Sequence, residues 1–204
     1  MSKIKHFVEQ SWLLIVSAFF FGLFIAVANA AWAPRIEANR IKKLNDLMQG
    51  LLTNAESFPV ETKVTIKSAK GKESEVTIYK ALSDPNDSNT CIGWAFNASG
   101  PGFADKIELV VAVDKNFENF AGFAVLSSNE TPGFGDRVAL PDYRDQYNNA
   151  PVTNLELVKT GDKDKIDAEI VAVSGATVSS EAVVKIINNT TAQIKTQMKE
   201  KGLL

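Results

Sequence analysis

The sequence predicts an α+β protein, in which a single N-terminal transmembrane helix precedes one domain built from an antiparallel sheet with flanking helices. Two observations predict this class. Residues 12–33 carry no charged side chain and are rich in Leu, Ile, Val, Phe and Ala. The roughly 170 residues that follow are enough for one domain with a substantial core, and they contain short β-type runs before a final helical pattern.

The apolar segment is long enough to cross a membrane. As a helix its 22 residues would rise ~1.5 Å each and reach roughly 33 Å, against about 30 Å of hydrocarbon. We expect a retained single span. A cleavable signal peptide is the alternative, because Lys3, Lys5 and the small residues 28–30 have the basic start and small-residue exit of such peptides.

Charged residues around the span give conflicting indications of its orientation. Lys3 and Lys5 precede it, whereas four basic residues follow it within residues 35–43. A positive-inside count therefore places the large domain in the cytoplasm. A short basic start before an apolar segment is also how export signals are built, which indicates the opposite orientation. Charge alone leaves both open.

Composition excludes several classes of function. The net charge of −2 gives no reason to expect nucleic acid as a partner. The one cysteine, Cys91, lies in an apolar strand-like run, and we expect it in the core, unable to form an intramolecular disulfide. The one histidine, His6, precedes the span, so the domain has no His-based metal site and no Ser-His-Asp triad.

Periodicity predicts the elements of the domain in order. Residues 34–57 have a helical apolar pattern and predict a stem that continues out of the membrane. Residues 129–147 predict a long ordered loop with one short helix near residues 142–147. Apolar residues at helical spacing predict a final helix from residue 179. The predicted strands are residues 63–68, 74–82, 92–97, 107–113, 120–127, 152–159 and 166–173, of which 107–113 and 120–127 are expected at the centre of the sheet.

Three glycine-containing segments stand out as candidate site loops: residues 99–103, 130–137 and 174–177. Glycine lets a backbone pass close to a planar ligand, and the nearby aromatics Trp94, Phe103 and Phe134 offer apolar walls. Residues 174–180 form a helix entrance whose amides and hydroxyls suit a phosphate. Each segment also has a plainer interpretation: a type II turn at Pro132-Gly133, packed core aromatics, and an ordinary capped loop before the helix.

Taken together, the order and spacing of these segments resemble the FMN-binding domain of electron-transport subunits that carry covalent flavin. In length and layout the chain is similar to the G subunits of Rnf complexes, with the C subunits of sodium-pumping NADH:quinone reductases as relatives. The matching parts are the N-terminal span, the Gly-Pro-Gly-Phe turn of residues 100–103, the Glu-Thr-Pro-Gly-Phe-Gly loop of residues 130–135 and the Ser-Gly-Ala-Thr motif of residues 174–177.

The resemblance implies that a separate flavin transferase esterifies Thr177 to the phosphate of FMN, with Ser174, Gly175 and Ala176 completing the motif. It implies a cofactor site that also includes Glu130, Thr131 and Gly133 as hydrogen-bond partners, Trp94, Phe103 and Phe134 as shields of the ring, and Gly102. Two positions depart from the family pattern, with Val171 in place of Asp and Ser128 in place of His. Noncovalent FMN, or a domain without flavin, therefore stays open.

The implied function is electron transfer through covalent FMN in a membrane-bound, ion-translocating ferredoxin:NAD oxidoreductase, with other subunits as partners and no turnover by the chain alone. The implied layout is a cytoplasmic segment at residues 1–11, the span at 12–33, a stem at 34–57 and an extracytoplasmic FMN-binding domain at 58–204, anchored in the bacterial inner membrane. The alternative is a membrane-tethered structural or assembly subunit without a redox cofactor.

Overall fold

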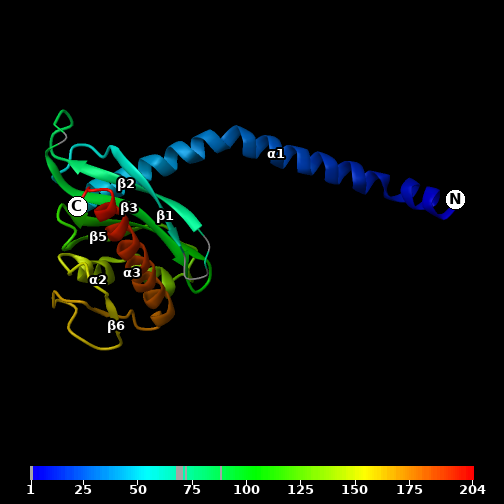
Figure 1. The fold of residues 1–204 in the computed structure, drawn as a ribbon. Coiled ribbons are helices and arrows are strands. Elements are labelled where there is room, and N and C mark those ends of the chain that lie inside the picture. Colours follow the sequence, from blue (N-terminus) through cyan, green and yellow to red (C-terminus); the bar gives the residue numbers. More distant parts are fainter. Residues whose placement is uncertain (1, 68–70, 72, 88) are drawn as a thin grey trace. The chain divides into compact units, whose positions relative to one another are not determined.

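The computed structural model describes residues 2–67, 71, 73–87 and 89–204, with side chains from residue 11 onward. Contacts divide the chain into two units, Met1–Lys43 and Leu44–Leu204. One helix, α1 (Ser2–Leu51), fills the first unit and continues into the second (Figure 1). It ends at Leu51 rather than at residue 57, because Thr53 and Asn54 form a turn, a conformation that polar residues of this kind favour.

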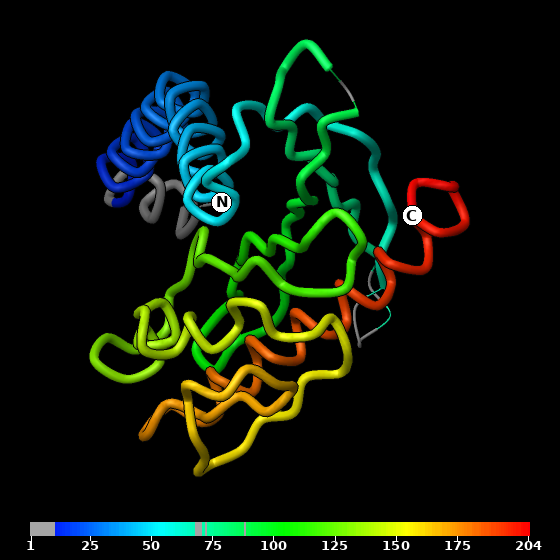
Figure 2. Tube along the Cα trace, turned by 90° about the vertical axis from the view of Figure 1, so that its left-hand side faces the viewer, coloured from blue at the N-terminus to red at the C-terminus, as the bar shows by residue number. Residues whose placement is uncertain are grey.

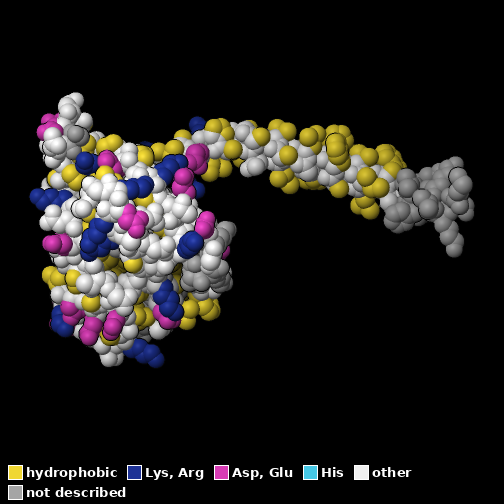
Figure 3. All heavy atoms as spheres, viewed as in Figure 1, with side chains coloured by type: hydrophobic (Ala, Val, Ile, Leu, Met, Phe, Trp, Pro, Cys, Tyr) yellow, Lys and Arg dark blue, Asp and Glu magenta, His cyan; other side chains and the backbone are white. Residues whose placement is uncertain are grey.

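The helical part of the first unit is strongly apolar. Within Ser11–Leu51 the mean hydropathy reaches 2.4, and this is the one described helix that is long and apolar enough to cross a membrane. Large apolar side chains such as Phe19, Phe21 and Phe24 are exposed along it, and Figure 3 shows the apolar atoms in yellow. Exposed apolar surface of this extent requires an apolar surrounding or a partner.

The second unit contains the predicted antiparallel sheet. Its five strands lie in sequence order, each paired with the next (Figure 1). They are β1 (Val60–Lys67), β2 (Glu73–Leu82), β3 (Cys91–Pro101), β4 (Lys106–Asp114) and β5 (Phe120–Ser127). Turn residues between β-type runs therefore predicted the meander correctly.

One expectation about the sheet was wrong. Strand β5 lies at the edge and not at the centre, although its residues are at least as apolar as those of β4. The start of its outer edge, at Phe120, is covered by the chain around Asn149 and Ala150. The amide of Phe120 donates to the carbonyl of Ala150 at 2.8 Å, and the amide of Asn149 donates to the carbonyl of Phe120 at 2.8 Å. A covered edge buries an apolar strand as a central position would.

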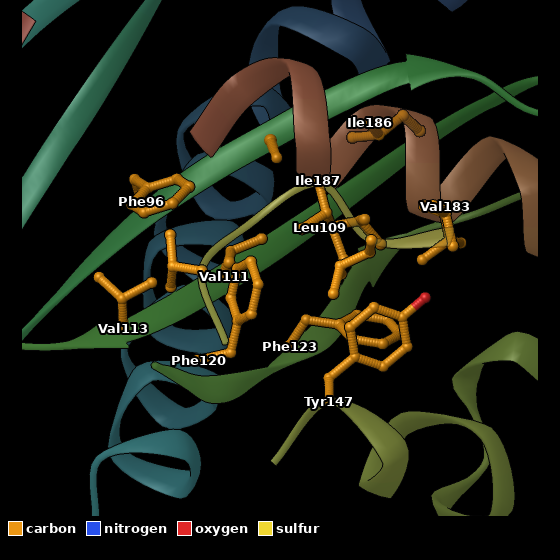
Figure 4. Packing of buried hydrophobic residues seen from close by; sticks show 14 of the residues in the cluster. Phe96, Leu109, Val111, Val113, Phe120, Phe123, Tyr147, Val183, Ile186 and Ile187 are labelled. Carbon is orange, nitrogen blue, oxygen red and sulfur yellow. The ribbon is translucent and has the colours of Figure 1, made fainter. Parts of the chain in front are cut away.

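Each face of the sheet is covered by a helix. Helix α3 (Thr177–Glu200) packs on one face, where Val183, Ile186 and Ile187 meet side chains of β3 and β4 (Figure 4). The last turns of α1, within the second unit, cover the other face with Leu44 and Met48, and Leu52 follows directly after the helix. Because side chains of a strand alternate between faces, β4 contributes to both cores.

The segment between β5 and α3 is irregular. It contains η1 (Gly135–Ala139), α2 (Pro141–Arg144), η2 (Asp145–Tyr147), β6 (Glu156–Val158) and β7 (Glu169–Val171). Strands β6 and β7 are shorter than predicted and pair in parallel, outside the main sheet, and Figure 2 shows this part in yellow and orange beside α3.

A side chain takes the place of a further strand beside β7. Gln146 is buried, and its Oε1 accepts the amide of Val171 at 2.8 Å while its Nε2 donates to the carbonyl of Val171 at 3.2 Å. Both backbone groups of Val171 are satisfied in this way, as burial requires. Gln146 therefore fixes the end of β7 three residues before the Ser-Gly-Ala-Thr motif.

Truncation of a buried side chain of α3 is expected to lower the stability of the domain strongly. Ile187 is fully buried between the helix and the sheet, so Ile187→Ala is expected to lower the free energy of unfolding by about 2–5 kcal/mol. The matched control is Ile166→Ala, because Ile166 is 63% exposed and its truncation should change stability by less than about 0.5 kcal/mol. Denaturant unfolding of the full chain in detergent measures both, and equal effects would contradict the packing.

Candidate functional site

The candidate loop of residues 174–177 is a tight turn that leads into α3. Helix α3 begins at Thr177, two residues before the predicted residue 179, and Gly175 has a φ of +81° that favours glycine. Ala176 occupies the N-cap position, and no side chain caps the helix there. Ser174 and Thr177 flank this N-cap residue and are exposed. The free amides and the positive end of the helix dipole remain available at this terminus.

Ser180 holds this turn against the helix. Its hydroxyl donates to the carbonyl of Ala176 at 3.0 Å and accepts the amide of Val173 at 3.0 Å. Its carbonyl accepts the hydroxyl of Tyr143 at 3.1 Å, and burial raises the pKa of Tyr143 well above its ordinary value, so the phenol stays a donor. The sequence had marked Ser180 only as part of the helix entrance.

The second candidate loop contains the expected turn. The amide of Phe134 donates to the carbonyl of Thr131 at 3.2 Å, and Gly133 has the positive φ, +77°, that a type II turn requires after proline. The plainer interpretation of this turn is therefore correct. The plainer interpretation of Phe134 is not, because its side chain is 58% exposed rather than packed in the core.

These loops enclose a pocket of about 470 Å³ at the start of α3. Six of the predicted site residues line it: Phe103, Thr131, Phe134, Gly175, Ala176 and Thr177. Three further lining residues, Gly135, Val178 and Ser179, were missed as ligand contacts, although all three lie within segments that the sequence had marked. A Cβ at Gly175 would make ordinary contact with the ring of Phe134 at 3.5 Å, so the positive φ, and not lack of space, favours glycine there.

The other predicted residues lie behind or away from the pocket lining. Gly102, Glu130, Gly133 and Ser174 belong to the same loops but do not line the pocket. Trp94 is placed elsewhere, because it is 4% exposed, pairs with Val113 across strands and donates its indole N–H to the carbonyl of Lys115 at 3.2 Å. The structure therefore places Trp94 in the core, at the opposite end of β3 from Phe103.

The lining suits a flat apolar ligand that also carries an anionic group. Phe103 is 66% exposed, and with Phe134 it presents aromatic surface beside the free amides of the helix start. None of the described residues that line the pocket is charged, and no cluster of metal-ligating side chains occurs among the described residues. The pocket thus offers a hydroxyl, small residues and aromatic walls, but no general acid or base.

Comparisons with known proteins agree with this geometry. The family model "FMN-binding domain" matches residues 102–192, which include all nine residues that line the pocket. The G subunit of an ion-translocating oxidoreductase complex of Methanosarcina acetivorans is 23% identical over 97% of this chain and 99% of its own. The G subunit of a proton-translocating ferredoxin:NAD(+) oxidoreductase complex of Clostridium ljungdahlii is 27% identical over 90% of this chain and 89% of its own.

Solved structures share the fold. The crystal structure of Shewanella oneidensis NqrC superposes with a TM-score of 0.56 and 26% identity, covering 72% of this chain and 73% of that one. The chain therefore carries an FMN-binding domain, and over most of its length it is similar to the G subunits of ion-translocating oxidoreductase complexes.

Proposed function

We propose that this chain is an electron-transfer subunit of a membrane-bound, Rnf-type ion-translocating ferredoxin:NAD oxidoreductase, and that it carries FMN on Thr177 as a phosphoester. The observation that carries the proposal is the exposed hydroxyl of Thr177 at the uncapped start of α3, inside the pocket that Phe103 and Phe134 flank. FMN supplies the redox chemistry when bound, because it accepts and passes on electrons one at a time.

The chemistry of the lining favours a covalent link over a purely ionic one. A phosphate at Thr177 would meet the free amides of the first turn of α3, which favour negative charge. No lysine or arginine is among the described lining residues, so no ion pair with the phosphate is available there. The ester joins Thr177 Oγ to the phosphorus of FMN with net loss of water, and it would retain the cofactor without a cation.

The remaining lining residues fit the rest of the cofactor. Phe103 and Phe134 would exclude water from part of the isoalloxazine, and Thr131 offers a hydroxyl beside them. Gly175 allows the left-handed backbone of the turn that places Thr177 at the pocket. We propose that Glu130, Gly102, Gly133 and Ser174 shape the loops around the cofactor, since they lie in the same segments outside the lining.

Maturation by a flavin transferase is part of the proposal. Val171 stands where the family pattern has Asp, and this difference could affect recognition by the transferase, because a transferase recognises residues near the attachment point. Val171 is 7% exposed, its backbone is held by Gln146, and its side chain faces Gly161 rather than the pocket. We therefore expect attachment to Thr177 to proceed with valine at this position.

We propose that residues 12–33 form the span, with residues 1–11 in the cytoplasm, a stem over residues 34–57 and the FMN-binding domain of residues 58–204 outside the cytoplasmic membrane. The length and hydropathy of α1 support the span. The pocket has no acid or base of its own, which supports a role as a relay among partner subunits rather than as an independent enzyme.

Removal of the hydroxyl tests the attachment point. Thr177→Val keeps the shape of the side chain, and the full chain co-expressed with a flavin transferase should lose all flavin fluorescence after denaturing electrophoresis. Thr177→Ser is the matched control, because it keeps a hydroxyl at the same place and should retain covalent flavin. Intact mass and peptide mapping measure the gain of FMN minus water; covalent flavin on Thr177→Val would end the assignment.

The conformation of the turn gives a second prediction. Gly175→Ala forces a side chain into a left-handed backbone at a cost of roughly 1 kcal/mol, which disfavours the turn before Thr177, so the flavinylated fraction should fall severalfold. Gly202→Ala is the control, since Gly202 has a φ of +69° at the other end of α3 and open space around it. An equal loss of flavin in both variants would show general destabilisation instead.

The orientation of the domain is tested by labelling. In a Cys91→Ala background, Asp164→Cys places a thiol at an exposed position of the domain. A membrane-impermeant maleimide should label it in intact spheroplasts as fully as after lysis. Labelling that requires lysis would place the domain in the cytoplasm.

A further inference from the structure

A buried carboxylate connects the three loops behind the pocket. Glu130 is 5% exposed, and its Oε1 accepts the amides of Phe103 at 2.9 Å and Ala104 at 3.0 Å. Its Oε2 accepts the hydroxyl of Ser179, in the first turn of α3, at 2.5 Å. Accepting three hydrogen bonds while donating none is the pattern of an ionised carboxylate.

The backbone closes around this carboxylate on two sides. A Cβ at Gly102 would overlap Oε1, and a Cβ at Gly135 would lie 2.7 Å from Oε2. Glycine at both positions therefore permits the close approach of the chain to Glu130. Enclosed in this way, the carboxylate does not line the pocket, whereas Ser179 and Gly135 do.

A second link lies outside the enclosed carboxylate. Asn129 Nδ2 donates to Asp105 Oδ2 at 2.8 Å, and this hydrogen bond lowers the pKa of the Asp105 carboxyl. Asp105 is in the same turn as Gly102, whose amide donates to the carbonyl of Asp105 at 2.7 Å. Unlike Glu130, this carboxylate is open to solvent, so water screens its charge.

We propose that Glu130 is a positioning residue of the flavin site, which holds the Phe103 turn against the start of α3 and places a fixed negative charge behind the Ser179–Gly135 wall of the pocket. The proposal rests on the function proposed above. Neutral groups separate the carboxylate from the pocket, and the low dielectric of a buried site makes its charge effective there. Such a charge opposes the addition of electrons to a bound cofactor.

The charge is tested by redox titration of the flavinylated full chain in detergent. Glu130→Gln preserves the shape of the side chain and removes its charge. The ratio of reduced to oxidised flavin at a given potential should rise at least tenfold, a shift of about 30 mV for a two-electron couple, toward positive potential. Asp105→Asn is the matched control, because it removes an exposed charge from the same turn and should leave the ratio within twofold.

Ser179→Ala separates charge from hydrogen bonding. It removes the hydroxyl that contacts Oε2 but leaves the carboxylate charged, so it should not reproduce the positive shift of Glu130→Gln. A purely structural role would give similar shifts in both variants. A Glu130→Gln titration that matches Asp105→Asn would overturn the electrostatic part of the proposal.

The positioning role is tested without flavin. In unmodified wild-type protein the amides of Phe103 and Ala104 should exchange with deuterium at least tenfold more slowly than solvent-exposed amides, although the Phe103 side chain is 66% exposed. Glu130→Ala, which removes the acceptor of both amides, should weaken this protection, and Ser179→Ala should preserve it. Rapid exchange in the wild type would overturn the positioning role, whereas wild-type protein that protects these amides but never acquires flavin would overturn only the proposed function.

Discussion

The packing of α3 on the sheet is the interaction on which the pocket depends. Val183, Ile187 and Ile194 are fully buried at helical spacing, so neither the axis nor the rotation of α3 is free to change. A helix held in this way has a fixed N-terminus. Ser180 then transmits that position to the turn before Thr177 through its contacts with Ala176 and Val173. The cofactor motif is thus placed by the core beneath it.

Around this fixed terminus the pocket combines a restrained backbone with exposed apolar side chains. The loop of Phe134 is set by a proline–glycine turn, and the turn of Phe103 is held by the carboxylate of Glu130. Both rings nevertheless remain more than half exposed. Apolar side chains without a partner lower their free energy when a ligand covers them, and a restrained backbone reduces the entropy lost on binding. These are the properties expected of a preformed cofactor site.

A preformed pocket that binds a cofactor but has no acid or base in its described lining is consistent with the proposed role in electron transfer within a complex. No acid or base is among the described residues that line the pocket, so the redox chemistry there would belong to the bound cofactor. The covalent link proposed above would suit a relay, because a relay that lost its cofactor would interrupt electron transfer through the whole complex. The apolar helix α1 keeps the domain close to such partners if it lies in the membrane.

Local patterns were enough to predict the apolar helix, the meander of strands, the final helix and the motif at Thr177, because periodicity, turn residues and short motifs act over neighbouring residues. Which residues meet across the domain depended on how the elements pack. The register between β3 and β4 places Trp94 in the core, and the chain near Ala150 pairs with the start of β5. Glu130 accepts hydrogen bonds from Phe103 and Ser179, which lie 27 and 49 positions away in the sequence. Contacts of this kind arise when distant segments fold onto one another, and no local pattern encodes them.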